Sequence, residues 1–368
     1  MYTLSLEIIN KCNLNCTYCY LGKKKNTYMS FETAKKAVDI AVHEANKQYD
    51  RTLAIYFIGG EPLMAYSIIR QVVEYTKVIC DRNSLKCQFS TTINGTLITD
   101  EIIDFFIENS FDLKVSLDGP EKVQDLNRKD YAGNGSFKKI MEKFPLLKKY
   151  EEGSGKRISI ASVITNNNYQ FYAESFQYLL DLGIKKIESG IDHYCKWNME
   201  QLSGLKSQIE EVVGIYKNFI IQTKQPIFWN LWEQYLKSYL FSCSFYACKA
   251  GLATCYVTTN GDIYTCAEIK AFKIGSVDSG LNVTRIREII YLEDQPEDTC
   301  VKCEYVNHCK TRGCQVANYE VNKSVFKPIE VNCEVTKCMY SLIKLNLTEK
   351  QLKIMKEDYE RRYGKYEK

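Results

Sequence analysis

Residues 10–20 read NKCNLNCTYCY and place Cys12, Cys16 and Cys19 in a CxxxCxxC spacing. They directly follow a stretch with a strand pattern, so the cysteines are expected on the loop after the first strand. Three thiolates can hold three corners of a [4Fe–4S] cube and leave the fourth iron open to a small molecule. A structural zinc site would close with a fourth ligand, and the nearest histidine, His43, lies in a helical pattern. The spacing favours an iron–sulfur cluster, although taken alone it leaves zinc open.

The cysteine count points to metal binding. The chain has 368 residues with sixteen cysteines but only three histidines, His43, His193 and His308. The N-terminus carries no export signal, and a reducing compartment would keep these thiols from forming a disulfide framework. We therefore expect a cytoplasmic protein with all-thiolate metal sites.

Composition argues against two broad classes of partner. The net charge is only +4, and the basic residues are scattered among acidic ones, which gives no surface for nucleic acid. No window holds about eighteen uninterrupted apolar residues, so no membrane span is expected. With 45% hydrophobic residues the chain can bury a sizeable core.

The first half of the chain alternates short β-branched runs with amphipathic stretches, the pattern of repeated βα units. An apolar stripe over residues 31–41 predicts a helix, with Ser30 as its N-cap. Six such units predict an α/β fold with a partial (β/α)6 TIM-like barrel, in which the loops after the strands meet on one face. The six expected strands span residues 3–9, 53–58, 88–93, 113–117, 158–164 and 184–191.

Changes in composition divide the chain into four expected segments. Residues 1–195 would form the partial barrel, and residues 196–242, rich in large apolar side chains, a helical bridge. Residues 243–340 hold ten of the sixteen cysteines and would form a metal-binding domain. Residues 341–368 have the pattern of a polar terminal helix.

The N-terminal motifs resemble those of the radical S-adenosylmethionine superfamily. Gly59, Gly60, Glu61 and Pro62 form a GGEP segment after the second expected strand. In that family the open iron binds the amino and carboxylate groups of S-adenosylmethionine, and reductive cleavage yields a 5′-deoxyadenosyl radical. The resemblance implies that GGEP receives the ammonium, since two glycines let backbone carbonyls come close, and that Tyr18 contacts the nucleotide. Taken alone, GGEP is simply a good turn.

Further cosubstrate positions follow later strands. Ser116 and Asp118 in VSLDGP, and Arg128 in DLNRKD, resemble segments that hold the ribose and the methionine carboxylate in close relatives. A hydroxyl and an arginine fork suit a carboxylate, although a strand-end turn and a solvated arginine would have the same sequence. The same pocket is expected to include Asn94 in INGT and Ile191 near the sixth strand end.

The C-terminal cysteines resemble those of a SPASM domain, with its CxxC pair and five-residue gap, although four residues instead of three separate Cys309 from Cys314. The resemblance implies two auxiliary clusters, which with the N-terminal cluster make three [4Fe–4S] clusters in all. One auxiliary cluster would be held by Cys248, Cys255, Cys266 and Cys314. The other would be held by Cys300, Cys303, Cys309 and Cys333.

Two points about these cysteines stay open. Cys338 lies one short loop beyond Cys333 and could replace it as the last ligand. A zinc ribbon is the competing interpretation, because CxxC followed by further cysteines is common in zinc sites, although ten cysteines exceed what one zinc needs. The cysteines left spare, for which burial as free thiols is the simple explanation, are Cys80, Cys87, Cys195, Cys243 and Cys338.

SPASM enzymes act on side chains of peptides or proteins. The segments INGTLI, SLDGP and LNRKD resemble those of the anaerobic sulfatase-maturing enzymes. Those enzymes form formylglycine with an aspartate directly after the GxxxxC cysteine as the base. That position is Ala267 here, which cannot accept a proton, unless Glu268 serves instead. We therefore expect a thioether or other crosslink in a small ribosomal peptide, with Glu268, Asp192, His193 and Tyr264 as candidate catalytic proton acceptors.

The resemblance implies a peptide or protein substrate and an electron donor such as flavodoxin or ferredoxin. We expect no separate peptide-recognition domain at the N-terminus, so a leader segment of the substrate would bind the barrel rim or a partner protein. A different class of function is a non-catalytic iron–sulfur or zinc-binding scaffold, which would keep the cysteines but has no need of GGEP or Arg128. Release of 5′-deoxyadenosine distinguishes the two.

Overall fold

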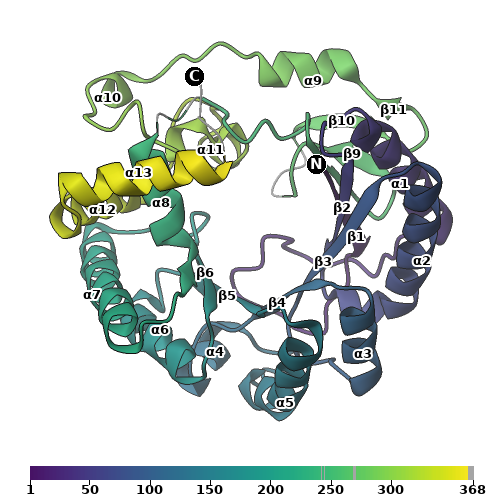
Figure 1. The fold of residues 1–368 in the computed structure, drawn as a ribbon, viewed down its shortest axis with the longest axis horizontal. Coiled ribbons are helices and arrows are strands. Elements are labelled where there is room, and N and C mark those ends of the chain that lie inside the picture. Colours follow the sequence, from purple (N-terminus) through teal and green to yellow (C-terminus); the bar gives the residue numbers. More distant parts are fainter. Residues whose placement is uncertain (242, 244, 268–270, 364–368) are drawn as a thin grey trace. The chain divides into compact units, whose positions relative to one another are not determined.

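The structure is a computed structural model that describes residues 1–241, 243, 245–267 and 271–363 (Figure 1). The chain forms two compact units. The first unit comprises Met1–Ser162 and Cys248–Leu292, and the second comprises Val163–Ala247 and Glu293–Lys368.

The strands of the first unit form one mixed sheet, ordered β11-β10-β9-β8-β1-β2-β3-β4-β5. Neighbours from β8 through β1 to β5 run parallel, and β8 to β11 are joined by antiparallel pairs. The strands are β1 Tyr2–Ile9, β2 Thr52–Gly59, β3 Lys86–Ile93, β4 Asp112–Ser116, β5 Ser159–Ile164, β8 Thr254–Val257, β9 Asp262–Tyr264, β10 Lys273–Ser276 and β11 Gly280–Leu281.

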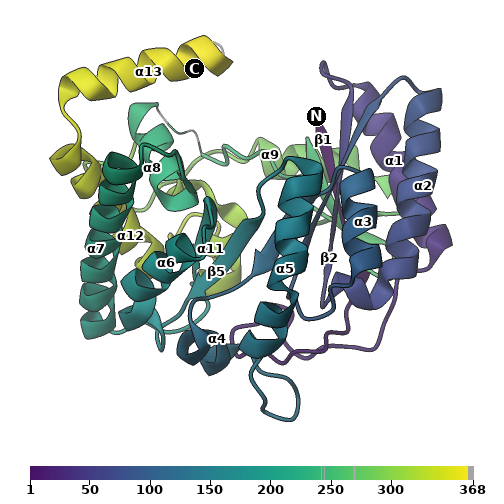
Figure 2. The same ribbon diagram turned by 60° about the horizontal axis from the view of Figure 1, so that its bottom comes forward.

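Helices α1, α2, α3 and α5 line the outside of these strands, and Figure 2 shows them side by side. The first begins at Ser30, whose hydroxyl accepts a hydrogen bond from the Thr33 backbone N–H at 3.0 Å, as the sequence predicted. The helices of this unit are α1 Phe31–Asn46, η1 Pro62–Ala65, α2 Tyr66–Arg82, α3 Asp100–Glu108, α4 Glu121–Asn127, α5 Phe137–Ser154 and α9 Val283–Ile290.

Aromatic side chains fill the space between this sheet and its helices. Phe57 and Phe89 project from neighbouring strands and stack on Phe111, with ring centroids 5.9 and 5.5 Å away. Phe106 of α3 packs on the same ring at 4.6 Å. Each such burial stabilises the fold by roughly 1.5–3 kcal/mol, so the core fixes the strands whose ends carry the site.

The second unit packs its helices around Trp229, whose side chain is fully buried. Phe176 and Tyr216 lie against this indole, with ring centroids at 5.3 and 5.7 Å. Its two strands, β6 Lys186–Ile191 and β7 Phe228–Trp229, pair in parallel. Its helices are η2 Tyr169–Phe171, α6 Tyr172–Asp181, α7 Met199–Thr223, α8 Asn230–Leu240, α10 Asp298–Val301, η3 Thr311–Gly313, α11 Gln315–Asn322, α12 Glu330–Asn346 and α13 Glu349–Tyr363.

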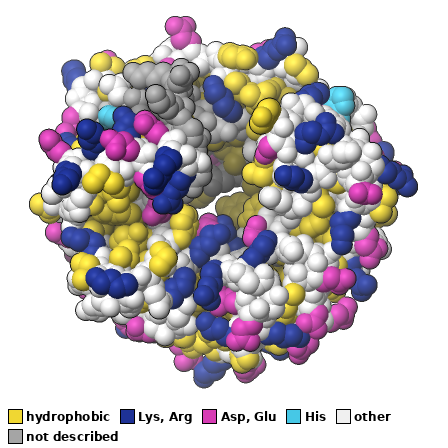
Figure 3. Space-filling view, in the orientation of Figure 1, with side chains coloured by type: hydrophobic (Ala, Val, Ile, Leu, Met, Phe, Trp, Pro, Cys, Tyr) yellow, Lys and Arg dark blue, Asp and Glu magenta, His cyan; other side chains and the backbone are white. Residues whose placement is uncertain are grey.

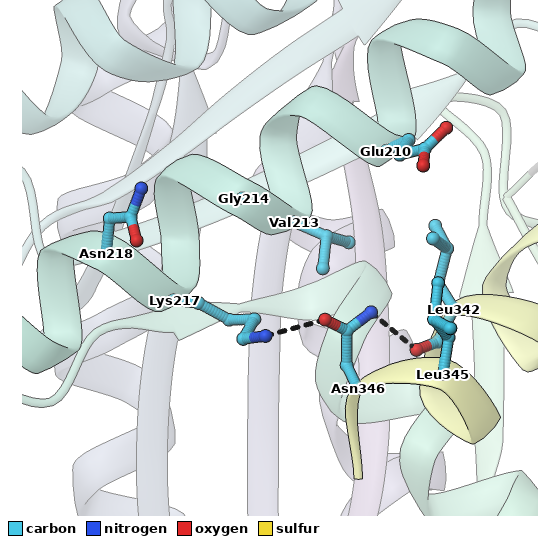
Figure 4. A pocket seen from close by; sticks show the side chains of 8 residues that line it. All are labelled: Glu210, Val213, Gly214, Lys217, Asn218, Leu342, Leu345 and Asn346. Carbon is cyan, nitrogen blue, oxygen red and sulfur yellow. Dashed lines mark hydrogen bonds between the residues drawn. The ribbon is translucent and has the colours of Figure 1, made fainter.

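A groove of about 160 Å³ runs between α7 and α12 (Figure 4). Lys217 crosses it and donates to Asn346 Oδ1 at 2.6 Å, while the Asn346 amide donates to the Leu342 carbonyl at 2.8 Å. Gly214 of α7 also lines it, with no other side chain near the position of a Cβ. These contacts fasten the C-terminal region of the chain to α7.

All six strands expected from the sequence are present, each within two residues of its predicted start and end, and the α/β fold is confirmed. The compact units do not follow the four predicted segments, because β8 pairs with β1 and brings residues after Cys248 into the first unit. The predicted boundary at residue 341 falls inside α12, whose buried side chains continue to Ile343. The partial barrel spans both units and stays a prediction.

In the part of the chain that the structure describes, no helix combines the length and apolar content needed to cross a membrane. On the face shown in Figure 3, basic and acidic side chains are interspersed. This agrees with the small net charge of +4.

Candidate active site

The cysteine loop leaves the C-terminal end of β1 and folds back on itself. Cys12 is buried, and its sulfur accepts a hydrogen bond from the Leu14 N–H at 3.4 Å. Lys24 donates to the Leu14 carbonyl at 2.6 Å. Burial raises the pKa of Cys12 to about 11, and burial also raises the pKa of Cys16, with Cys19 close enough to add to it. Cys12, Cys16 and Cys19 are thus neighbours on one loop, and burial keeps Cys12 and Cys16 as neutral thiols in the metal-free chain.

A second segment, residues 127–130, holds the cysteine loop in place. The backbone N–H groups of Asn15 and Thr17 donate to the carbonyls of Lys129 and Asn127, at 2.7 and 3.0 Å. The Thr17 hydroxyl donates to the Asn127 side chain at 2.7 Å. The sequence analysis missed Asn127, because nothing in its local pattern indicates a partner more than a hundred residues away.

The GGEP segment lies directly against the start of the cysteine loop. The Gly60 N–H donates to the Ile9 carbonyl at 2.8 Å, and the Glu61 N–H donates to the Lys11 carbonyl at 3.0 Å. A Cβ on Gly59 would come within 2.0 Å of the Ile9 carbonyl oxygen, and one on Gly60 equally close to that of Lys11. The glycines are therefore required for backbone contact with the cysteine loop, a reason beyond the one inferred from the sequence.

Glu61 is almost fully buried and serves as a backbone clamp. Its carboxylate accepts hydrogen bonds from the N–H groups of Leu63 at 3.1 Å and of Asn94 at 2.7 Å. Burial raises the pKa of Glu61 to about 7, and the two amide donors oppose that rise. The residue thus links the GGEP segment to the end of β3.

Asn94 connects the end of β3 to the cysteine loop. Its amide donates to Asn13 Oδ1 at 2.7 Å and lies 3.9 Å from the Cys12 sulfur. Thr96 closes this network, because its hydroxyl donates to Asn94 Oδ1 at 2.7 Å and accepts from the Asn13 amide at 2.8 Å. Asn94 therefore positions Cys12, and Asn13 and Thr96 are positioning residues that the sequence analysis missed.

The VSLDGP and DLNRKD segments meet through a buried ion pair. Arg128 donates from Nε and Nη2 to the two carboxylate oxygens of Asp118, at 3.0 and 2.9 Å. The hydroxyl of Tyr18 donates to the same carboxylate at 2.6 Å, and the Arg128 guanidinium lies 5.2 Å from the centre of the Tyr18 ring. Ser116 is buried at the end of β4. The structure thus brings Tyr18, Asp118 and Arg128 into contact, and Ser116 lies two residues before Asp118.

Ile191, Asp192 and His193 follow β6 in the second unit. The Asp192 N–H donates to the Ile164 carbonyl at 2.8 Å, and its Oδ1 accepts from the Tyr194 N–H at 2.9 Å. His193 packs on Tyr194 at 4.4 Å between ring centres, and its Nε2 has no hydrogen-bond partner among the described residues. These positions lie at a strand end, as expected, and their roles stay predictions.

Tyr264 of β9 lies in a mostly apolar cluster with Ile58 and Tyr256, and Ala267 packs against the same cluster. Burial raises the pKa of Tyr264, so its phenol stays protonated at neutral pH. Glu268, the other predicted base in this segment, lies outside the described residues.

Glu7 of β1 is a buried carboxylate beside this cluster, with only 2% of the residue exposed. It accepts a hydrogen bond from the Asn10 amide at 2.6 Å and lies close to the Tyr256 phenol. The sequence analysis missed Glu7, because an acidic residue inside an expected strand is normally assigned to the solvent side.

Four C-terminal cysteines converge in the second unit. Burial raises the pKa of Cys333 to about 12, and the nearby thiolates of Cys309, Cys300 and Cys303 add to that rise. Cys338 lies apart from them, with its thiol 3.9 Å from the Lys206 carbonyl. Cys333 is therefore the better placed of the two alternatives for the last ligand.

The other predicted auxiliary ligands are spread over both units. Cys248 is exposed in the first unit, and Cys266 is partly buried there. Cys255 is 2% exposed, pairs in register with Leu4 of β1, and lies beside the buried phenol of Tyr2. This placement is that of an interior thiol, so ligation by Cys255 is the least supported of these predictions.

Among the described residues, no three cysteine, histidine or carboxylate side chains are grouped closely enough to hold a single metal ion. In a four-iron cube each thiolate binds a different iron, so the ligands surround a larger centre. The donor sets around Cys12 and Cys333 consist of thiols with amide and cationic neighbours, which is the chemistry that such a cube requires.

The chain belongs to the Radical SAM superfamily, which matches residues 6–206, more than half of the chain. An uncharacterized protein of Methanocaldococcus jannaschii is 34% identical over 189 residues, which cover 51% of this chain and 61% of that protein. A cysteine-type anaerobic sulfatase-maturating enzyme of Clostridium perfringens is 27% identical over 334 residues, which cover 83% of this chain and 86% of the enzyme.

Solved structures share the fold at lower identity. Native anSMEcpe with bound AdoMet and Cp18Cys peptide has a TM-score of 0.76 and 21% identity, covering 97% of this chain and 99% of that one. Streptococcus suis SuiB bound to the precursor peptide SuiA has a TM-score of 0.62 and 18% identity, covering 90% and 75%. Membership of the superfamily implies one [4Fe–4S] cluster and S-adenosylmethionine, and the residues around Cys12, Cys16 and Cys19 fit both.

Proposed function

We propose that this chain is a radical S-adenosylmethionine oxidoreductase that modifies side chains of a ribosomal peptide and forms a thioether or another crosslink. The observation that carries the proposal is the fastening of the three-cysteine loop to three other segments, namely residues 59–61, 94–96 and 118–128. A structural metal site needs only its ligands, whereas here polar groups of three further segments are held against the cysteine loop.

When bound at the cluster, S-adenosylmethionine supplies a 5′-deoxyadenosyl radical that abstracts hydrogen from unactivated carbon. Residues 59–61 offer backbone carbonyls to the ammonium of its methionine part. Arg128 keeps Nη1 outside its two bonds to Asp118, so it can still approach the methionine carboxylate. Tyr18 and Ser116 flank the nucleoside. In this proposal Asp118 orients Arg128 and does not itself bind the carboxylate.

The C-terminal cysteines would hold two auxiliary clusters, giving three in all. The thiols around Cys333 support the second of these, because four partly buried thiols lie near one another in the second unit. A cluster at that position can accept the electron that is released when a substrate radical forms a new bond. An electron donor such as flavodoxin or ferredoxin would reduce the N-terminal cluster in the cytoplasm.

A peptide or protein substrate is supported by what related proteins bind. The structures with a similar fold include anSMEcpe with the Cp18Cys peptide and SuiB with the precursor peptide SuiA. In this chain the substrate would approach the strand ends that carry the cysteine loop.

Formylglycine formation in a sulfatase is the second candidate, and the similarity to the Clostridium perfringens enzyme along most of both chains favours it. Against it stands Ala267, which occupies the position of the expected base and packs against Tyr256 and Tyr264. Among the described residues Glu7 is a buried carboxylate close to this cluster, so it is our candidate proton acceptor in place of an aspartate.

Anaerobic reconstitution tests the proposal. Three cubes require roughly twelve irons per chain, and reductant with S-adenosylmethionine should release 5′-deoxyadenosine. Cys16→Ala should abolish this release. Cys195→Ala is the control and should preserve it, because Cys195 is a spare thiol that donates a hydrogen bond to the Asp192 carbonyl. Cys303→Ala should preserve the release but stop product formation. Low iron content and no nucleoside in the unaltered protein would instead support the non-catalytic scaffold.

The two reactions are separated by their products. A short cysteine-bearing precursor or a sulfatase encoded beside this gene supplies the candidate substrate. Mass spectrometry then distinguishes the two products. A crosslinked peptide contains a segment that does not fragment, whereas an aldehyde reacts with a hydrazine probe. If the aldehyde forms without a crosslink, the protein forms formylglycine and the crosslinking proposal is wrong.

A further inference from the structure

The turn between Cys309 and Cys314 has one residue more than the SPASM pattern, and the structure shows what that turn does. Residues 311–313 form the single 3₁₀ turn η3. Cys309 lies just before this turn, and the backbone amides of Thr311 and Arg312 lie near its sulfur. Amides near a ligand sulfur stabilise negative charge on that sulfur.

The same turn buries the side chain of Arg312, leaving the residue 7% exposed. Its Nη1 forms an ion pair with Asp294, and its guanidinium lies 5.8 Å from the centre of the Phe245 ring. The Nε atom is buried and has no hydrogen-bond partner among the described residues. A buried N–H donor normally has an acceptor, so the free Nε of Arg312 indicates an acceptor that is not part of the polypeptide.

Arg312 stands in the turn that follows Cys309, and its guanidinium interacts electrostatically with Cys309 and Cys300. Cys303 and Cys333 complete the group. A cube held by four thiolates carries net negative charge, and its reduction adds one more. A cation that is shielded from water acts on such a centre more strongly than an exposed one.

We propose that Arg312, oriented by Asp294, raises the reduction potential of the auxiliary cluster held by Cys300, Cys303, Cys309 and Cys333. The inference rests on the proposed function, because it requires that cluster. Arg312 acts through its positive charge and not by contact with the substrate. A higher reduction potential makes transfer of one electron from the substrate radical to the oxidised cluster more favourable.

A redox titration of the reconstituted holoenzyme, followed by electron paramagnetic resonance, tests this. Arg312→Gln should lower the midpoint potential of the auxiliary cluster by about 59 mV. For a one-electron couple this corresponds to a tenfold change in the ratio of reduced to oxidised cluster. Asp294→Asn should shift it in the opposite direction, because the cation loses its counter-charge. Arg312→Lys should keep most of the wild-type potential.

Lys337 provides a matched control. It lies near Cys333 and Cys303, but its side chain is 54% exposed and paired with Glu334. Lys337→Gln removes the same charge from a solvated position, so its shift should be clearly smaller than that of Arg312→Gln.

Iron content separates the failure of this inference from failure of the proposed function. If the unaltered protein binds only about four irons, no auxiliary cluster exists and the proposed function is wrong on that point. With about twelve irons bound, an unchanged midpoint in Arg312→Gln and Asp294→Asn overturns the inference. Should Arg312→Gln lose iron, Asp294→Asn decides alone, because it retains the arginine.

Discussion

Arg128 binds both oxygens of the Asp118 carboxylate, through Nε–H···Oδ2 at 3.0 Å and Nη2–H···Oδ1 at 2.9 Å. The side chains of this pair are 8% and 0% exposed. The burial of Asp118 alone would be unfavourable, so the two residues depend on one another. This pair ties the end of β4 to the segment that holds the cysteine loop.

Asp118→Asn should destabilise the protein by about 3–5 kcal/mol, because it leaves the Arg128 cation buried without its counter-charge. Chemical denaturation under anaerobic conditions measures the change. The control is Glu121→Gln, which removes the partner of Lys138 in a pair whose side chains are 81% and 52% exposed, and should cost under about 1 kcal/mol. Equal costs for the two variants would contradict a structural role for the buried pair.

Gly60→Ala should abolish 5′-deoxyadenosine release and reduce iron binding together, because its methyl group would displace the Lys11 carbonyl and with it the cysteine loop. Gly214→Ala is the matched control, since the helix α7 leaves open space at that position. It should leave activity unchanged and stabilise the helix by about 0.5–1 kcal/mol. An active Gly60→Ala enzyme with full iron content would show that the backbone contact is dispensable.

The pKa of Glu61 predicts a pH dependence of stability. Burial raises this pKa from 4.5 to about 7 in the folded protein, so the native state keeps a proton that the unfolded chain has released. The contribution of Glu61 is therefore fully present below pH 4.5 and is lost as pH rises through about 7. The apoprotein should lose on the order of 3 kcal/mol across this window.

Glu61→Gln removes the titrating group, so the dependence of its unfolding free energy on pH should be flatter between these limits. The amide also gives up one acceptor for the Leu63 or Asn94 N–H, which lowers stability at every pH. The difference in slope is thus the test, and parallel curves for the two proteins would refute it.

Glu7→Gln should leave 5′-deoxyadenosine release intact but reduce product formation by about 10²-fold or more, if this carboxylate takes the substrate proton. Asp262→Asn is the control, because that carboxylate also lies near Tyr264 but is paired with Lys273 at the surface. It should retain product formation. If the Glu7→Gln enzyme gives a normal product yield, Glu7 is not the catalytic base.

Local pattern was sufficient to predict the six strands and the Ser30 cap, because alternation and capping depend on near neighbours in sequence. It could not predict that residues 254–257 pair with β1, since a four-residue run fits many sheet positions. For the same reason the cysteine spacing could not distinguish Cys255, which faces the interior beside Tyr2, from a ligand.

The candidate site was predicted motif by motif, and its connections were not. Each of Cys12, Gly60, Asn94 and Arg128 follows from a short segment of sequence. The side chains that join them, such as Asn127, make contacts that depend on the folded chain. The ion pair between Asp294 and Arg312 is another such case, because its partners lie 18 residues apart in different segments.

The close approach of Gly59 and Gly60 to residues 9–11 has a practical consequence for protein engineering. In a chimera that receives only the cysteine loop of a relative, the backbone of that loop would not fit against residues 59–60. The loop and residues 59–61 should be transplanted together, as one exchangeable module.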